Sequence, residues 1–354
     1  MRNDEFLNVK KILNTKDIKG ERCYIHILRG NRSCGKTFNI LKLFIERFLS
    51  RKEQFCLLYR TKNECKNAHL ILSDILDLYF SDYVAFKTIE IVENVIFSIQ
   101  IENIKTKEVL EVGFAISFYD VDKIKKYSAI FKKVNYLFFD EFELENHRYF
   151  KNEFEKFTSI IFSISRGGGQ VIRNITILLA ANNCDVYNPY FIGFKILDKL
   201  NKIENNILRL DGIVLHIIEN EVVKKEMKNN KMLSAFKDNN YLKYAIDNTA
   251  LKDRETFLVS KNYISKNHCN FVTTILNNND YYSIWLDINN KCMIFSDIKM
   301  ENSKIVFTIT ENEKIPSTKD STFNGLKKLI RDYANKNAIY YTSIKCIEII
   351  ENIL

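Results

Sequence analysis

The sequence predicts an α/β protein with a central, mainly parallel sheet, followed by a smaller α+β domain. In the first half of the chain, short apolar runs alternate with longer segments that carry apolar residues at helical spacing. These short runs, at 23–30, 53–60, 134–142 and 174–183, are continuously apolar, which is typical of parallel strands covered on both faces. Beyond about residue 254, strand-like runs follow one another directly with polar turns between them.

Between the first strands the periodicity predicts helices over 36–50, 63–80 and 149–165. The runs at 94–101 and 109–119 predict a hairpin or meander inserted between the main units. We therefore expect a first domain over 1–203, a polar helical linker over 204–253 and a second domain over 254–354. In the second domain we expect strands at 268–277, 280–289, 291–298 and 304–312, and helices at 322–336 and 341–354.

Composition limits the classes of partner. The net charge of +9 suits a polyanion, although richness in lysine and asparagine is equally the mark of an AT-rich genome. No apolar run approaches the roughly 18 residues of a membrane span, and the charged start does not look like a signal peptide, so we expect a soluble cytoplasmic protein without a membrane partner. The eight cysteines form no C-x-x-C pair, so neither a zinc site nor a disulfide framework is indicated.

A glycine-rich motif, GNRSCGKT, occupies residues 30–37 and matches G-x-x-x-x-G-K-[S/T] (Walker A). Gly30 and Gly35 allow the backbone to aim N–H groups at phosphates, and the following helix directs its positive end at the same anion. Lys36 is placed to reach the β- and γ-phosphates, and the Thr37 hydroxyl to coordinate Mg²⁺. The alternative is a glycine turn with an incidental lysine. A strand before the motif and a helix after it favour a P-loop that binds ATP and Mg²⁺.

An acidic pair, Asp140 and Glu141, ends the buried run YLFFDEF (Walker B). Ligands of parallel sheets bind at the carboxyl ends of strands, so Asp140 suits the Mg²⁺ shell and Glu141 suits the orientation or deprotonation of a water. This second carboxylate is typical of hydrolytic ATPases of the additional-strand, catalytic-glutamate (ASCE) type. The alternative is a solvated acidic strand end, because DEFELE continues acidic.

Two further polar positions follow predicted elements. Arg166 precedes three consecutive glycines at 167–169, and is either an arginine finger for a neighbouring subunit or a charge on a surface loop. Asn182 and Asn183 end an apolar strand, where an amide can sense the γ-phosphate or the attacking water.

The order of P-loop, FDEF, arginine loop and NPYF resembles the DNA-packaging ATPases of tailed phages. The likeness is strongest to the compact φ29-type encapsidation ATPases, relatives of terminase large subunits, and runs from about residue 20 to the end. It implies the P-loop roles for Lys36 and Thr37, the metal role for Asp140 and the catalytic role for Glu141. Arg166 lies where the family carries its trans-acting arginine.

The resemblance also implies a lysine at the subunit or DNA boundary, for which Lys123, Lys125 and Lys126 are candidates. Arg32, inside the P-loop, is another candidate for contact with the nucleotide or a neighbour. The implied activity is ATP hydrolysis that drives double-stranded DNA into a prohead. The implied machine is a homomeric ring, commonly a pentamer, docked on the portal (connector), with a packaging RNA as a possible further partner, in the cytoplasm of the infected cell.

By the same resemblance the second domain is RNase H-like. A nuclease of that kind clusters acidic residues around two metal ions, and the sequence offers Asp287, Asp297 and Glu301. No second acidic cluster appears near the last helices, so we expect a nuclease-inactive domain that binds DNA, connector or RNA.

Alternatives remain at the level of sequence. They are a terminase with an active metal-dependent nuclease, a cellular DNA-stimulated P-loop ATPase such as a helicase, and a nucleotide-gated DNA-binding scaffold. The absence of helicase motifs after the acidic strand counts against the second, and the Asp140–Glu141 pair against the third.

Overall fold

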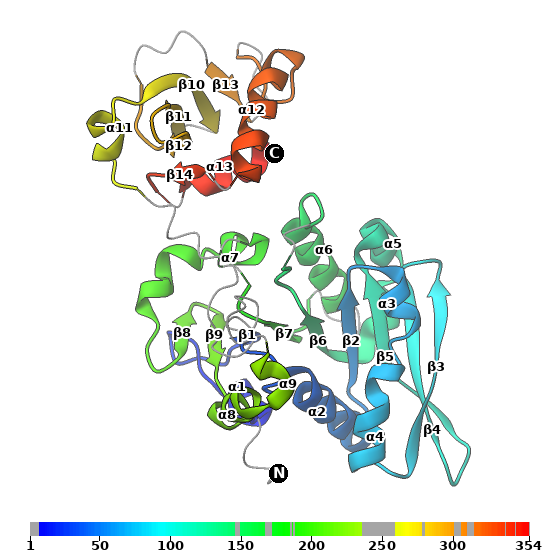
Figure 1. Ribbon diagram of the computed structural model, residues 1–354. Helices are drawn as coiled ribbons and strands as arrows, with labels where there is room; N and C mark the ends of the chain where they lie inside the picture. Colours follow the sequence, from blue (N-terminus) through cyan, green and yellow to red (C-terminus); the bar gives the residue numbers. More distant parts are fainter. Residues whose placement is uncertain are drawn as a thin grey trace. The chain divides into compact units, whose positions relative to one another are not determined.

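The chain forms two units, which span residues 1–252 and 253–354 (Figure 1). The computed structural model describes residues 7–145, 149–166, 172–184, 186, 188–235, 259–277, 280–300, 306–309, 315–336, 338–343 and 345–353.

The first unit is built on a nine-stranded sheet with the order β3-β4-β5-β2-β6-β7-β1-β9-β8. The strands are β1 Ile25–Gly30, β2 Gln54–Tyr59, β3 Tyr83–Val92, β4 Ile96–Asn103, β5 Val109–Ser117, β6 Val134–Asp140, β7 Thr176–Ala181, β8 Ile207–Leu210 and β9 Ile213–Ile218. From β5 to β9 every neighbouring pair in this order is parallel. The strands β3, β4 and β8 are antiparallel to their neighbours. The central parallel sheet is therefore confirmed.

Helices cover both faces of this sheet. The α-helices as far as residue 193 are α1 Val9–Leu13, α2 Lys36–Arg51, α3 Lys62–Lys66, α4 Ser73–Tyr79, α5 Val121–Lys126, α6 Glu153–Ser165 and α7 Pro189–Gly193. Consecutive side chains of β6 show which helix covers which face, because they point to opposite sides of the sheet. Phe138 contacts Phe44 of α2 and Phe139 contacts Phe157 of α6, with ring centroids 6.3 and 6.2 Å apart. Helices α2 and α6 consequently lie on opposite faces.

Two parts of the sheet differ from the expectation. The run at 109–117 is β5, which pairs in parallel with β2 and so belongs to the main sheet as well as to the meander. Beyond residue 203, where we expected a linker to begin, β8 and β9 form a hairpin whose second strand pairs with β1. The sequence signal for this hairpin is Asp211-Gly212 between apolar runs, with Gly212 at φ 71° as a tight turn requires. Helices α8 Glu221–Asn229 and α9 Lys231–Ser234 follow it.

The second unit is an α+β domain with a five-stranded mixed sheet of order β13-β10-β11-β12-β14. Its elements are α11 Asn262–Lys266, β10 Asn270–Asn277, β11 Asp280–Asp287, β12 Cys292–Ser296, β13 Val306–Thr308, α12 Asn324–Asn335, β14 Ile339–Tyr341 and α13 Lys345–Ile353. The central strands β10, β11 and β12 form the expected antiparallel meander, and the short outer strands β13 and β14 pair in parallel. Among the described residues no helix is long and apolar enough to cross a membrane.

Candidate functional site

The P-loop connects β1 to α2 at the carboxyl edge of the parallel strands. Gly35, the N-cap residue immediately before α2, has a left-handed backbone conformation with φ 79°, which favours glycine at this position. Gly30 is required for a second reason, because a Cβ there would lie 2.1 Å from the carbonyl oxygen of Ile218 on β9. The late strand β9 therefore helps to define the start of the P-loop.

Lys36 is buried and its ammonium lies across the loop. Its Nζ donates to the carbonyl oxygens of Gly30 at 3.0 Å and Asn31 at 2.9 Å. It also donates to the side-chain Oδ1 of Asn182, just beyond β7, at 3.3 Å. The predicted sensor amide is thus brought to the P-loop lysine.

The metal candidates Thr37 and Asp140 are in contact, with the Thr37 hydroxyl donating to Oδ2 of the carboxylate. Burial raises the pKa of Asp140 to about 6, opposed by the Thr37 hydrogen bond and reinforced by the neighbouring Glu141 charge. A carboxylate in such a place is stabilised in its charged form by a cation. A hydroxyl and a carboxylate side by side are oxygen ligands of the kind that Mg²⁺ prefers.

Glu141 is exposed beside this pair, at the point where the chain leaves β6. Its backbone is left-handed, with φ 52°, and its N–H donates to Oδ1 of Asp140 at 3.0 Å. Arg60, which follows β2, donates to the carbonyl oxygens of Glu141 and Phe142, each at 2.7 Å. The same guanidinium forms a 2.7 Å ion pair with the buried Glu153 at the start of α6. Arg60 therefore fixes the strained backbone that carries Glu141.

The acidic segment beyond Glu141 forms further ion pairs with arginines near the P-loop. Glu143 is buried, and its carboxylate accepts hydrogen bonds from Nε and Nη2 of Arg29 at 2.8 and 3.0 Å. It also accepts a hydrogen bond from the N–H of Cys184 at 3.2 Å. Glu145 pairs with the predicted site residue Arg32 at the surface. We had not predicted roles for Arg29 and Arg60. The available signal was their position, since each lies at the carboxyl end of a strand next to β6 or β7.

Arg166 lies away from this site. Helix α6 begins beside Arg60 and returns across the sheet for about 20 Å, the length of its 13 residues. Its far end reaches the start of β6, where Arg173 bonds to the carbonyl oxygens of Ile164 and Val134. Arg166 is exposed there, at the edge of the sheet opposite Asp140. The geometry brings the other site residues together and leaves Arg166 apart.

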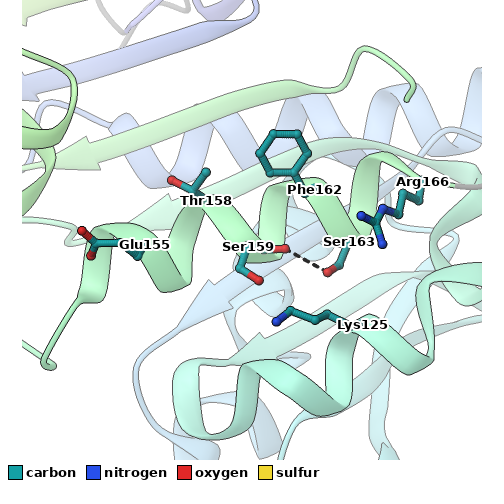
Figure 2. A pocket seen from close by; sticks show the side chains of 7 residues that line it. All are labelled: Lys125, Glu155, Thr158, Ser159, Phe162, Ser163 and Arg166. Carbon is teal, nitrogen blue, oxygen red and sulfur yellow. Dashed lines mark hydrogen bonds between the residues drawn. The ribbon is translucent and has the colours of Figure 1, made fainter. Parts of the chain in front are cut away.

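A cavity of about 330 Å³ adjoins Arg166 between α5 and α6. Figure 2 shows Lys125 across this cavity from Ser159 and Ser163 of α6, with Arg166 at the end of the helix. Of the three candidate lysines, Lys125 alone lines this cavity. Its ammonium also forms a 2.7 Å ion pair with Asp122.

The two described acidic candidates of the second unit, Asp287 and Asp297, lie too far apart to share a two-metal site. Asp287 ends β11 opposite Cys292, whereas Asp297 follows the other end of β12, so the ladder places them about 17 Å apart. Two-metal sites hold ions about 4 Å apart. Asp287 accepts hydrogen bonds from Tyr263 and Asn290, each a local structural contact. Glu301 lies outside the described residues, and among those described no group of three potential ligands is found.

A family model decides the relationship of this chain to known proteins. The model for podovirus DNA encapsidation protein (Gp16) matches residues 5–341. The chain belongs to the podovirus Gp16 family. The predicted resemblance to phage DNA-packaging proteins is confirmed at this level.

Relatives of this Gp16 family member include the DNA packaging protein of Bacillus phage phi29, 23% identical over 310 residues, or 87% of this chain and 83% of that one. The DNA packaging protein of Bacillus phage B103 is 23% identical over 293 residues, or 82% of each chain. A solved structure of the bacteriophage phi-29 viral genome packaging motor assembly shares the fold, with a TM-score of 0.60, 19% identity and 99% coverage of both chains. A phi-28 gp11 DNA packaging motor gives a TM-score of 0.59 with 17% identity, over 96% of this chain and 95% of that one.

Proposed function

We propose that this Gp16 family member is an ATPase that drives double-stranded DNA into a prohead as part of a homomeric ring. The observation that carries the proposal is the convergence of P-loop and strand-end groups. Lys36 donates a hydrogen bond to Asn182, and Thr37 donates one to Asp140. A loop that only turned the chain would not need a buried lysine, a hydroxyl and a carboxylate at one strand edge.

The residues fit a bound MgATP. The N–H groups of the P-loop and the start of α2 would hold the phosphates, and Lys36 would exchange its loop carbonyl partners for phosphate oxygens. Thr37 and Asp140 would hold the ion, which when bound would neutralise charge on the phosphate oxygens. Glu141 would orient a water and accept its proton.

Arg166 is proposed to act on the nucleotide of a neighbouring subunit. Its distance from its own Asp140, across the sheet, supports action in trans rather than in cis. An arginine delivered by a neighbour makes hydrolysis depend on how two subunits are placed, which suits a ring. Lys125, which lines the same cavity, is proposed to lie at the boundary between the two subunits.

DNA, the prohead portal and a packaging RNA are proposed partners. The proposed site of action is the cytoplasm of the infected cell. The net charge of +9 supports contact with a phosphate backbone, and such contacts carry no sequence information. The domain of residues 254–354 is proposed to bind one of these partners without cutting DNA, since Asp287 and Asp297 lie at opposite ends of their strands.

Packaging can be measured as protection of DNA from DNase after addition of cognate proheads, packaging RNA and ATP. We expect protection with the wild-type protein and none with Lys36→Ala or Glu141→Gln, while Lys52→Ala, a substitution at the far end of α2, serves as control. Equal protection without ATP, or with Glu141→Gln, would contradict the proposal.

A further inference from the structure

Helix α6 ends one residue before the proposed trans-acting arginine. Ser165 is its last residue, and Arg166 leaves in an extended conformation with φ −77° and ψ 155°. The last carbonyl groups of any helix lack partners within the helix and need donors from elsewhere. Whatever supplies those donors also fixes the direction in which Arg166 leaves the helix.

Arg173 supplies donors to the last two of these carbonyl groups. Its backbone N–H donates to the carbonyl oxygen of Ser165 at 2.8 Å, and its Nη2 donates to that of Ile164 at 2.9 Å. One residue thus bonds, through backbone and side chain, to the two positions that immediately precede Arg166. A cation at this place also interacts favourably with the negative end of the helix dipole.

The same guanidinium connects the end of α6 to the sheet. Its Nη1 donates to the carbonyl oxygen of Val134, the first residue of β6, at 3.1 Å. Its Nη2 also donates to Phe131, in the short helical segment before β6, at 2.8 Å. The acceptors come from three separate elements, and β6 is the strand that ends in Asp140 and Glu141.

Only a guanidinium suits this set of acceptors. Arginine presents five donors in a rigid plane, whereas lysine presents its donors from a single nitrogen. Lysine at 173 would keep the charge and the backbone hydrogen bond, and would lose the simultaneous contact with the helix end and the strand start. The lysine variant therefore separates positioning from charge.

We propose that Arg173 is a positioning residue, which fixes the last turn of α6 against β6 so that Arg166 is presented to the neighbouring subunit. The proposal rests on the proposed trans role of Arg166 and adds a residue that never touches the nucleotide. In this arrangement a subunit that lacks Arg173 keeps its own P-loop, Asp140 and Glu141. Its defect appears in the active site of its neighbour.

The test uses steady-state ATP hydrolysis by the full chain in its assembled ring, for Arg173→Lys alone and mixed with other variants. We expect Arg173→Lys to lower turnover about tenfold or more, because the arginine finger would be only partly in place. Binding of a non-hydrolysable ATP analogue should not change. Mixing with Glu141→Gln, which supplies an intact Arg166, should restore activity, and mixing with Arg166→Ala should not. The matched control is Arg51→Lys, at an exposed arginine with a 3.9 Å pair to Glu53, which should behave as wild type.

Three results would overturn the proposal. Wild-type turnover by Arg173→Lys would remove the positioning role. A loss that Glu141→Gln does not restore, while the same partner restores Arg166→Ala, would show damage within the subunit's own site and leave the trans role of Arg166 intact. Full activity of Arg166→Ala would remove the trans role itself, and with it this proposal. Arg173→Gln provides the same mixing test if the lysine variant does not fold.

Discussion

Arg29 and Glu143 form a buried bidentate ion pair, 2.8 and 3.0 Å long, between the strand that enters the P-loop and the segment that follows Asp140 and Glu141. Glu143 also accepts a hydrogen bond from the N–H of Cys184, two residues after Asn182 in the segment that follows β7. One carboxylate therefore connects the three segments that form the site.

Removing one partner of this pair should be strongly destabilising. Glu143→Gln leaves the Arg29 charge buried with a weakened partner, and we expect a loss of about 3 kcal/mol in the free energy of unfolding, measured by urea denaturation. The matched control is Glu145→Gln, which breaks the surface pair with Arg32 and should cost less than about 1 kcal/mol. Equal effects of the two substitutions would contradict the structural role of Glu143.

Asp140 should make the nucleotide-free protein less stable as pH rises. Its pKa of about 6 exceeds the ordinary value of 3.8, so the folded carboxyl binds its proton more tightly than the unfolded one. Ionisation therefore opposes folding progressively between about pH 4 and pH 6, and fully above that. Asp140→Asn should be more stable than wild type at pH 8, by about 3 kcal/mol, and equally stable near pH 4. A stability difference that does not change with pH would contradict this cause.

Arg60 should affect turnover more than nucleotide binding. It holds the carbonyl oxygens of Glu141 and Phe142 and does not itself contact the P-loop lysine. We expect Arg60→Lys to lower kcat for ATP about tenfold or more while KM changes little, because the position of the catalytic carboxylate is lost and phosphate binding is kept. A rise in KM at constant kcat would show instead that Arg60 contributes to binding.

Asp287 should be a structural residue of the second unit. It accepts hydrogen bonds from Tyr263 and Asn290, and these together lower its pKa despite the opposing effect of burial. Asp287→Asn should lower the thermal stability of the chain. In the presence of Mn²⁺, neither the wild-type protein nor this variant should cut DNA. Mn²⁺-dependent cutting by the wild-type protein that the substitution abolishes would establish an active nuclease.

The sequence predicted the local parts of this site better than the connections between them. The P-loop and the Asp140–Glu141 pair were recognisable because each chemical role fixes residue types within a few positions of one strand end. Arg29 and Arg60 also lie at strand ends, but their carboxylate partners Glu143 and Glu153 lie about a hundred residues away, so the sequence does not show the pairing.

The strands beyond residue 203 were missed for a related reason. The hairpin of β8 and β9 has a local turn signal at Asp211-Gly212, but its place in the sheet depends on pairing with β1, far earlier in the chain. Gly30 illustrates the consequence, because the close approach of Ile218 on β9 leaves no room for a side chain there.

An ATPase whose active sites are shared between subunits of a DNA-translocating ring should hydrolyse ATP faster when double-stranded DNA is present, and this is the first measurement to make. Wild type, Glu141→Gln, Arg166→Ala and mixtures of the two variants would be compared. We expect DNA to stimulate the wild type, each variant alone to be inactive, and their mixture to regain activity through interfaces that combine an intact Glu141 with an intact Arg166. Hydrolysis that ignores DNA, together with wild-type activity of Arg166→Ala, would contradict this expectation.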